Sequence, residues 1–353
     1  AYLTAQRRRA HARAPAAPAA TPEAGSEPRE LSWEDVVPVD SIGLEVGYRL
    51  IPLVDKAQGG ALMTRIKGVR KKLSQEIGFL VPAVHIRDNL DLAPNVYRIA
   101  LNGVALAETE VYPDRELAIN PGRVFGALPG IATRDPAFGL EAVWLERGSR
   151  EQAQTLGYTV VDASTVVATH LSHLIKNHAH ELLTREDVQQ LLNNLSKTAP
   201  KLVEDLVPKT LSPAIVHKVL QNLLEERVPI RDMRVIAETL AVHAGKSQDP
   251  GALTAAVRIA LGRSMLQQIN GLASDLPVIS LDPALEQLLL QSTQIAGEGG
   301  AGFEPGLIDK MRRALVEIAQ RQTAAGQPVV VLSAPGLRPW LSRFARQALP
   351  EAY

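Results

Sequence analysis

Four histidines lie close together near the middle of the chain, at His170, His173, His178 and His180. Imidazole nitrogens are common metal ligands and general bases, so this cluster is the first candidate for chemistry. His170 and His173 are three residues apart, which places them on one face of a helix. A zinc site needs further ligands, however, and nothing in the sequence identifies them. A metalloenzyme therefore remains only a distant alternative, and we expect no metal site here.

Two other patterns could suggest an enzyme, and both lack the necessary context. Asp162, Ser164 and His170 could form a triad, but a helix puts the serine and the histidine on poorly matched faces. Residues 297–302 match G-x-G-x-x-G, yet they follow a predicted helix, whereas a dinucleotide site needs this motif directly after a strand. Because no Walker A, H-E-x-x-H or G-x-S-x-G sequence occurs either, we expect no catalytic residues and no cofactor.

Charge and composition exclude several classes of protein. The 38 basic residues balance 38 acidic ones, so the cationic field that generic nucleic-acid binding requires is missing and no nucleic-acid partner is expected. The chain has no cysteine, which excludes disulfides, thiolate nucleophiles and cysteine-bound metals. Its 46% hydrophobic residues suffice for two or three domain cores. No run reaches the roughly 18 to 20 apolar residues of a membrane-spanning helix.

Two aromatic residues stand in unusual surroundings. Phe138 lies between Pro136 and Gly139, in a segment that is typical of a loop. Trp33 follows an Ala- and Pro-rich segment and has acidic residues on both sides. The Phe138 ring could fill a core of its own. Trp33, at the end of a predicted linker, has no core to enter, and tryptophan anchors dominate interface hot spots. Both residues are therefore candidates for contacts with a partner.

The elements that must position these residues follow from periodicity. Residues 1–37 are rich in Ala and Pro and carry a basic group at Arg7–Arg9, which predicts a flexible linker. Alternation predicts strands at 44–48, 81–86, 96–101, 104–107, 116–121, 142–145 and 158–161, with Asn102-Gly103 as a type I′ hairpin turn. Helices are predicted at 61–77, ending at Gly78, and at 150–156, and residues 121–136 are predicted to be mostly loop.

The remainder of the chain is predicted to be mainly helical. Asp162 is a candidate N-cap for one long helix to about residue 183, and caps at Thr184, Ser212 and Asp249 begin further helices up to about residue 270. A closing β-α-α-β-α unit is expected, with strands at 278–281 and 329–332. The predicted fold class is α+β or α/β with several subdomains: mixed α/β first and last subdomains, a small β-containing insert and an all-helical third subdomain.

Several long segments carry a family resemblance. They are GYRLIP at 47–52, HIRDN at 85–89, LAINP at 117–121, DPAFGL at 135–140, VDASTVVATH at 161–170, and the stretches 202–224 and 228–234. From about Trp33 to Ala352 the chain resembles the cytoplasmic domains of the FHIPEP family, the export gates of type III secretion. The flagellar branch fits better than the virulence (injectisome) branch, which remains the alternative.

The resemblance implies a domain organisation and a location. A membrane part would precede residue 1, followed by a linker at 1–37 and a first α/β subdomain at 38–113 and 163–183. An inserted subdomain would occupy 114–162, a helical subdomain 184–262, and a truncated α/β subdomain 263–353. The protein would belong to the bacterial inner membrane through the preceding part alone, with this segment in the cytoplasm.

The resemblance also implies docking rather than catalysis. Family members form a ring, expected to be a nonamer, that binds flagellar export chaperones with their substrates and helps to order export. Components of the export ATPase complex and the cytoplasmic domain of the export switch protein are further expected partners. The implied chaperone-binding residues are Asp135, Phe138 and Thr169, with Pro121, Val161 and Val166 as apolar lining. The implied linker-docking residues are Glu30, Trp33 and Asp35, which would occupy the site on a neighbouring subunit when no chaperone is bound.

Overall fold

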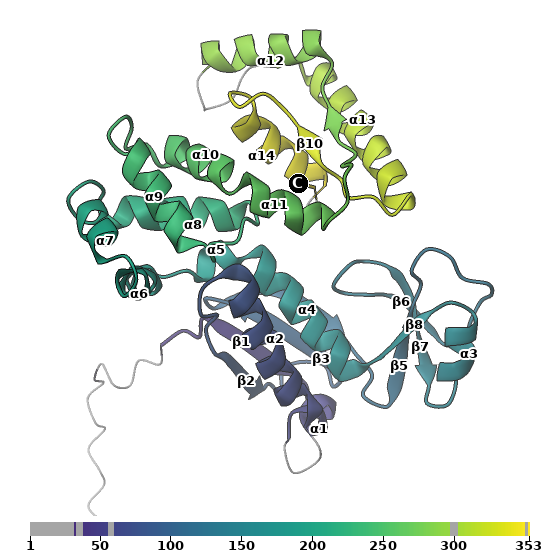
Figure 1. Cartoon of the computed structure of the whole chain (residues 1–353). Coiled ribbons are helices and arrows are strands. Elements are labelled where there is room, and N and C mark those ends of the chain that lie inside the picture. The colour runs from purple at the N-terminus through teal and green to yellow at the C-terminus, as the bar shows by residue number, and fades with distance from the viewer. Residues whose placement is uncertain (1–31, 33–37, 56–59, 297–302, 350–351) are drawn as a thin grey trace, which may run out of the picture. The chain divides into compact units, whose positions relative to one another are not determined.

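The computed structural model in Figure 1 describes residues 32, 38–55, 60–296, 303–349 and 352–353. The chain divides into two units, residues 1–39 and 40–353, and the fold given below is that of the second unit. The predicted linker-docking residues Glu30, Trp33 and Asp35 lie outside the described residues, as does the glycine-rich segment 297–302.

The first sheet contains β1 (Ile42–Val46), β2 (Val84–Asp88), β3 (Val96–Leu101) and β4 (Val104–Glu110) in the order β2-β1-β3-β4. β1 is parallel to β2 and antiparallel to β3. The predicted Asn-Gly hairpin is confirmed, since Asn102 and Gly103 have φ angles of 48° and 80° and join β3 to the antiparallel β4. The strand predicted at 44–48 lies two residues earlier, at Ile42–Val46. It ends there because Tyr48–Leu50 forms a 3-10 turn, which α1 (Ile51–Val54) follows.

Two long helices lie side by side against this sheet (Figure 1). α2 (Ala61–Ile77) ends at Gly78 as predicted. The single helix predicted from 163 to 183 is wrong: α4 (Ala163–Asn177) ends before His178, and a separate short helix α5 (Ala179–Leu182) follows. The chain is interrupted here, and Ala179 and Leu182 of α5 are buried in the main core together with residues of the later helices.

The inserted sheet contains β5 (Arg115–Ile119), β6 (Ile131–Arg134), β7 (Glu141–Glu146) and β8 (Thr159–Asp162) in the order β6-β7-β5-β8. One of its faces joins the main core through Leu117, Ala142 and Trp144. The other face packs with α3 (Arg150–Thr155) in a small separate core. The prediction of a loop at 121–136 missed β6, because this edge strand is largely exposed and shows no hydrophobic alternation.

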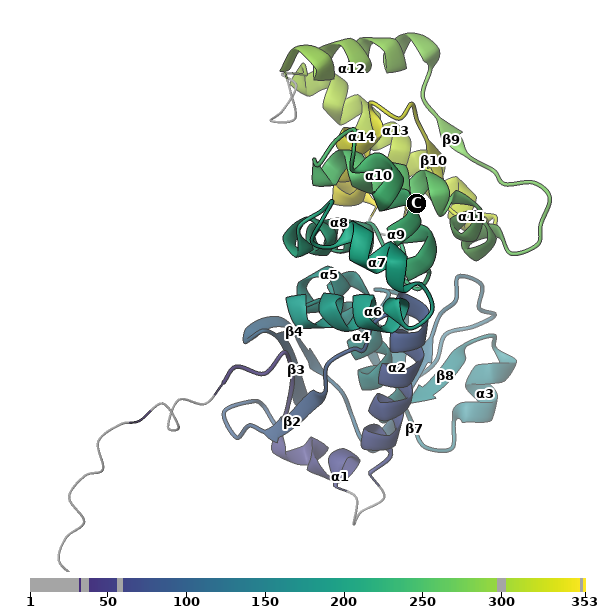
Figure 2. The same ribbon diagram turned by 60° about the vertical axis from the view of Figure 1, so that its left-hand side comes forward.

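The helical segment contains six helices: α6 (Arg185–Ser196), α7 (Pro200–Leu206), α8 (Pro213–Glu225), α9 (Met233–His243), α10 (Pro250–Ala260) and α11 (Gly262–Asn270). Figure 2 shows them from the side. The predicted caps are confirmed, since the side chains of Thr184, Ser212 and Asp249 each accept a hydrogen bond from the first turn of a helix. One buried cluster runs continuously from Ile42 on β1 to Leu261 at the end of α10.

The closing segment contains β9 (Ile279–Ser280), α12 (Pro283–Ala296), α13 (Pro305–Ala324), β10 (Val331–Leu332) and α14 (Arg338–Ala348). The predicted order of strands and helices is confirmed, although both strands are shorter than predicted. β9 and β10 pair in parallel over two small cores of their own. None of the described helices combines the length and the apolar character needed to cross a membrane.

Candidate functional site

The loop 135–140 between β6 and β7 is closed by its own hydrogen bonds. The backbone N–H of Asp135 donates to the carbonyl of Leu140 at 2.8 Å, and the N–H of Gly139 donates to the carbonyl of Asp135 at 2.8 Å. Asp135 is 3% exposed, and its carboxylate accepts the backbone N–H of Phe138 at 2.8 Å. Gly139 has a φ of +69°, which glycine adopts without strain. The loop is thus ordered by its backbone and by one buried carboxylate.

This loop presents Phe138 to solvent. The side chain of Phe138 is 62% exposed, so it does not fill a core of its own in the described structure. Its only described ring contact is with His173 on α4, at 5.5 Å between ring centroids and an angle of 78°. This edge-to-face geometry is favourable for aromatic rings. The molecule therefore exposes a large aromatic ring on a rigid loop, supported by one helix.

The start of α4 is fixed by Asp162, as the sequence predicts. The carboxylate of Asp162 accepts the N–H of Thr165 at 2.9 Å and pairs with Arg65 of α2 at 2.7 Å. Burial raises the pKa of Asp162, but hydrogen bonds from Ser164 and Thr165 and the charge of Arg65 outweigh burial and leave this pKa below its ordinary value. A charged N-cap therefore joins α4 to α2.

Beyond its cap, α4 carries a row of polar residues at four-residue spacing. Thr165, Thr169, His173 and Asn177 are all half-buried, and residues at i and i+4 lie on the same face of a helix. Phe138 packs on the third member of this row. The opposite side of α4 enters the main core through residues such as Val167 and Leu171. We call these four residues the α4 row.

The predicted chaperone-binding residues have different environments. Phe138 is exposed, and Thr169 lies in the α4 row one turn before His173. Pro121 is exposed at the end of β5, whereas Val161 is half-buried on β8 and packs against the core. Val166 is 2% exposed, so it can only support this surface from beneath.

His173 also makes a polar contact. From the sequence, the only role considered for this residue was that of a metal ligand. Its Nε2 lies 2.8 Å from Nδ2 of Asn177. Arg227, two residues after α8, donates from Nη2 to Oδ1 of Asn177 at 2.7 Å. The i, i+4 spacing of His173 and Asn177 was readable from the sequence, but the contacts with Phe138 and Arg227 come from distant segments. The four-residue spacing is the one signal that could have found this pair.

His170 is a buried residue of the core rather than an accessible ligand. Its Nδ1 forms a 2.7 Å hydrogen bond with the hydroxyl of Tyr97 on β3. Burial, with a smaller contribution from His173, lowers the pKa of His170 to about 4, and burial raises the pKa of Tyr97. His170 is therefore neutral at physiological pH.

The other two histidines of the cluster belong to the α4–α5 junction. Nδ1 of His178 lies 2.7 Å from Oε1 of Glu181, and the rings of His178 and His180 stack with centroids 6.4 Å apart. Burial is the largest influence on His180 and lowers its pKa. Within the described residues, no three His, Cys, Asp or Glu side chains are placed to hold a metal ion.

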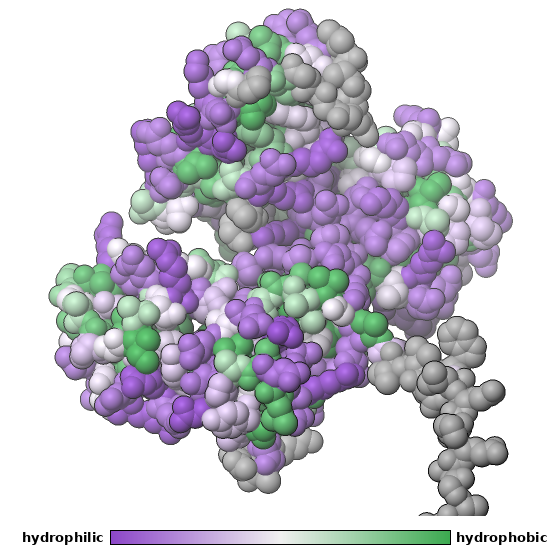
Figure 3. All heavy atoms as spheres, turned by 180° about the vertical axis from the view of Figure 1, so that it is seen from behind, coloured by the Kyte–Doolittle hydropathy of each residue, from purple (hydrophilic) through white to green (hydrophobic). Residues whose placement is uncertain are grey.

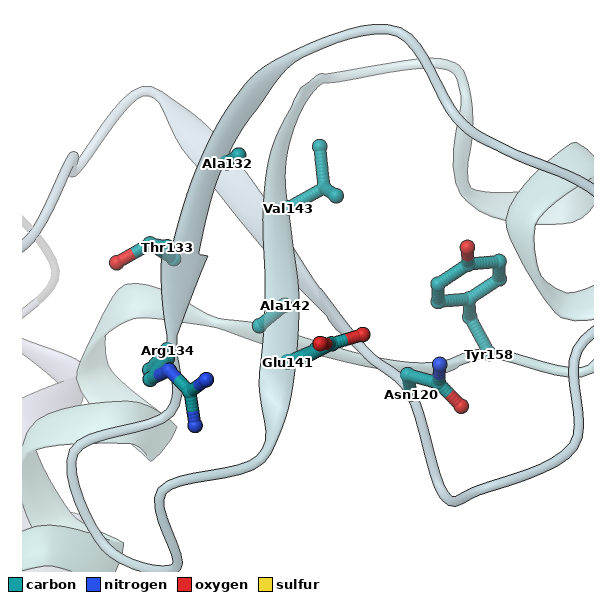
Figure 4. Close-up of a pocket in the computed structure, with 8 residues that line it drawn as sticks. All are labelled: Asn120, Ala132, Thr133, Arg134, Glu141, Ala142, Val143 and Tyr158. Carbon is teal, nitrogen blue, oxygen red and sulfur yellow. The ribbon is translucent and has the colours of Figure 1, made fainter.

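A shallow pocket of about 300 Å³ lies on the inserted sheet, beside the strand ends that the 135–140 loop connects (Figure 4). Arg134 and Glu141, which are opposite each other on β6 and β7, line it together with Asn120 and Tyr158; the other lining residues are Ala132, Thr133, Ala142 and Val143. None of the predicted chaperone-binding residues lines this pocket.

The insert has few exposed large apolar residues. They are Phe125, Ile131, Phe138 and Leu140. Figure 3 shows the face of the molecule opposite to that in Figure 1, where apolar residues form several small patches on a largely hydrophilic surface. Scattered apolar residues are normal on a soluble surface, so the feature that distinguishes Phe138 is its rigid presentation rather than a large patch.

Comparisons with known proteins place the chain in a family. The sequence model of the FHIPEP family matches residues 1–353. The "Flagellar biosynthesis protein FlhA" of Escherichia coli (strain K12) is 56% identical over 322 residues, which are 91% of this chain and 46% of the relative. The chain thus spans about half the length of the curated relatives it matches.

Two solved structures share the fold at low sequence identity. One is the Chlamydia pneumoniae CdsV and CdsO protein complex, with a TM-score of 0.75 and 23% identity over 90% of this chain and 96% of that chain. The other is the nonameric EPEC SctV-C, with a TM-score of 0.71 and 19% identity over 89% of this chain and 93% of that chain. Since the family model matches every residue and the fold agrees as well, the chain belongs to the FHIPEP family.

Proposed function

We propose that this chain is the cytoplasmic docking part of a flagellar type III export gate, and that export chaperones carrying their substrates bind at Phe138. The observation that carries this proposal is the exposed Phe138 ring on a hydrogen-bonded loop, supported by His173 of α4. A rigid aromatic ring loses little conformational entropy when it is covered, and such rings are frequent interface hot spots. Thr169 and the rest of the α4 row would supply polar contacts beside it.

The flagellar branch is favoured over the injectisome branch. The match to the flagellar relative is 56% identical, whereas the two solved structures above are 23% and 19% identical. The preceding membrane part, which we expect to anchor the protein in the bacterial inner membrane, would lie before residue 1. EPEC SctV-C, which shares the fold, is nonameric, and we propose a ring of the same kind for this chain.

We also propose partners other than chaperones for this chain. CdsV was solved together with CdsO, so a fold of this type can bind a second protein. We expect this chain to bind components of the export ATPase complex and the cytoplasmic domain of the export switch protein. A docking role needs no catalytic group, and we propose that the chain is not an enzyme.

The linker would regulate the docking surface by competition. A random coil of about 30 residues has an r.m.s. end-to-end distance near 30 Å, and tethering raises the local concentration of its end to the millimolar range. Trp33, with Glu30 and Asp35, could therefore occupy the Phe138 surface of a neighbouring subunit while binding weakly. A chaperone would displace the linker by binding the open surface more tightly.

Calorimetric titration tests this function. An Escherichia coli flagellar export chaperone, loaded with its substrate, is titrated into the wild-type chain, Phe138→Ala and Phe125→Ala, with circular dichroism as the check of folding. Phe125 is a matched control, because it is also in the insert and is 85% exposed. Loss of a hot spot predicts at least about 30-fold weaker binding for Phe138→Ala and less than about twofold for Phe125→Ala. Equal affinities of Phe138→Ala and wild type would overturn the proposal.

The linker has a separate test. Trp33→Ala should lower the chaperone concentration that gives half-occupancy, since one competitor is removed. An unchanged or higher concentration would contradict competition by the linker without affecting the role of Phe138. Binding seen only in Trp33→Ala would mean that the linker keeps the surface closed in the wild type.

A further inference from the structure

We propose that His173 is a positioning residue of the docking surface: its neutral ring supports Phe138, and protonation of His173 weakens partner binding. This inference rests on the proposed docking function, which it deepens by adding a regulatory residue. The contacts of His173 on two sides, with Phe138 and with Asn177, support it.

The first contact is between the two rings. Phe138 is more than half exposed, and a side chain with so little cover would otherwise change rotamer freely. The edge-to-face contact with His173, at 5.5 Å and 78°, favours one orientation of the Phe138 ring. His173 thus reduces the conformational entropy that a partner must remove on binding.

The second contact is with Asn177, and its geometry shows which terminal atom of Asn177 is the oxygen and which is the NH₂ group. A guanidinium group only donates hydrogen bonds, so the Asn177 atom that lies 2.7 Å from Nη2 of Arg227 must be the amide oxygen. The other terminal atom of Asn177 is then the NH₂ group, which donates to Nε2 of His173 at 2.8 Å. Nε2 must therefore carry a lone pair, and neutral His173 has its proton on Nδ1.

A second proton on His173 is incompatible with this arrangement. An imidazolium has an N–H on both nitrogens, so Nε2–H would face the N–H of Asn177. Asn177 cannot flip to present its oxygen, because its NH₂ group would then face the donors of Arg227. Protonation therefore breaks the contact with Asn177, which is one of the contacts that orient the ring beside Phe138.

Other titratable and charged groups surround this site. Among the residues that the structure describes, they are His170 and Lys176 on α4, Tyr97 of β3, Arg134 and Asp135 at the 135–140 loop, and Arg227 just after α8. His170 is neutral above about pH 4. The carboxylate of Asp135 is committed to the N–H of Phe138.

The test is the pH dependence of chaperone binding. The same chaperone–substrate complex is titrated at pH 7.5 and pH 5.5 into the wild-type chain, with circular dichroism at both pH values. We expect wild-type affinity to fall about 3- to 10-fold at the lower pH, as the support of one aromatic pair is lost. Because the partner also contains titratable groups, the comparison with variants decides the matter.

Three variants separate the contributions of His173. His173→Gln keeps an oxygen acceptor for Asn177 but has no ring and no titration, so it should bind more weakly at pH 7.5 and lose the pH response. His173→Phe keeps the ring, so it should bind within about threefold of wild type at pH 7.5 and respond little to pH. His178→Gln, at the end of the same helix, should keep the full response. A wild-type pH response in His173→Gln and His173→Phe would overturn the inference.

A second readout is independent of any partner. The ¹⁵N chemical shifts of the His173 ring distinguish the two neutral forms, and we expect the proton on Nδ1 at pH 7.5. A proton on Nε2 would overturn the inference while the role of Phe138 still stood. Absence of chaperone binding by both the wild type and Trp33→Ala would instead overturn the proposed function, and this inference with it.

Discussion

At the scale of residues, one side chain of the candidate site holds the loop in place and another is open to a partner. Asp135 is buried and holds the backbone of the loop, whereas Phe138 is exposed and available to a partner. An aromatic residue between Pro136 and Gly139 was visible in the sequence as an unusual feature. The support by His173 was not, because a contact between a loop and a distant helix leaves no periodic pattern. Residue types indicated the surface, and only the fold shows which side chains meet.

Asp135 is predicted to act through the loop rather than by touching the partner. Asp135→Asn keeps an oxygen that can accept the N–H of Phe138, so chaperone affinity should stay within about threefold of wild type. Asp135→Ala leaves that N–H without its acceptor, and the lost hydrogen bond of about 1 kcal/mol should weaken binding by about fivefold or more. Calorimetry on the two variants checks this. Equal losses in both would show that the charge of Asp135 itself contacts the partner.

His170 predicts an acid sensitivity of the fold. Its pKa is lowered to about 4 by burial, while the unfolded chain titrates near 6.5. Stability is therefore complete above about pH 6.5 and falls as the pH drops toward 4, because only the unfolded state takes up the proton. We expect a loss of about 1–2 kcal/mol at pH 5, measured by urea unfolding against pH 7.5. His170→Gln should show a smaller loss, and an equal loss would contradict the assignment.

At the scale of elements, α4 connects the inserted sheet to the rest of the fold. Its N-cap, the Asn102-Gly103 turn and the end of α2 at Gly78 were predictable, because each depends on a local residue type. β6 was missed because an exposed edge strand lacks alternation. The break at His178 was missed because the helix ends where tertiary packing draws Ala179 into the core, a cause that local sequence does not contain.

The cap of α4 provides a prediction for this element. Asp162→Ala removes the acceptor for Thr165 and the partner of Arg65, and should lower the free energy of unfolding by about 1–2 kcal/mol. Since α4 carries Thr169 and His173, chaperone binding should weaken as well. Thr184→Ala is the control, because it removes the cap of α6 at a similar cost in stability but should leave binding unchanged. Unaltered binding by Asp162→Ala would mean that the site does not depend on this cap.

At the scale of the whole molecule, one continuous core joins the first sheet to the helical segment, and one charged cluster links the helical segment to the closing segment. The core passes from the first sheet into the helical segment without interruption, so the two subdomains proposed on either side of residues 183 and 184 share one core. The carboxylate of Glu226, directly after α8, forms an ion pair with Arg258 of α10 at 2.7 Å and also pairs with Arg338 and Arg346 of α14. This carboxylate links the closing segment to the helices, a long-range arrangement that sequence spacing could not predict.

Removing the charge of Glu226 should loosen this connection. The three arginine side chains are only 18–28% exposed, so in Glu226→Gln they would be left without their anionic partner. We expect the free energy of unfolding to fall by about 2–3 kcal/mol in a urea titration followed by tryptophan fluorescence. Glu317→Gln breaks a well-exposed pair with Arg321 and should change it by less than about 0.5 kcal/mol. Equal effects of the two variants would contradict a structural role for the cluster.

The most direct test of chaperone docking is photo-crosslinking in cells that assemble flagella. Phe138 or Phe125 is replaced by p-benzoylphenylalanine in the full-length protein, and products formed on irradiation are identified by mass spectrometry. Docking at Phe138 predicts crosslinks to export chaperones from position 138 and few or none from position 125, although Phe125 is the more exposed of the two. Chaperone crosslinks from position 125 alone, or from neither position while the cells still export flagellar proteins, would contradict the claim that chaperones dock at Phe138.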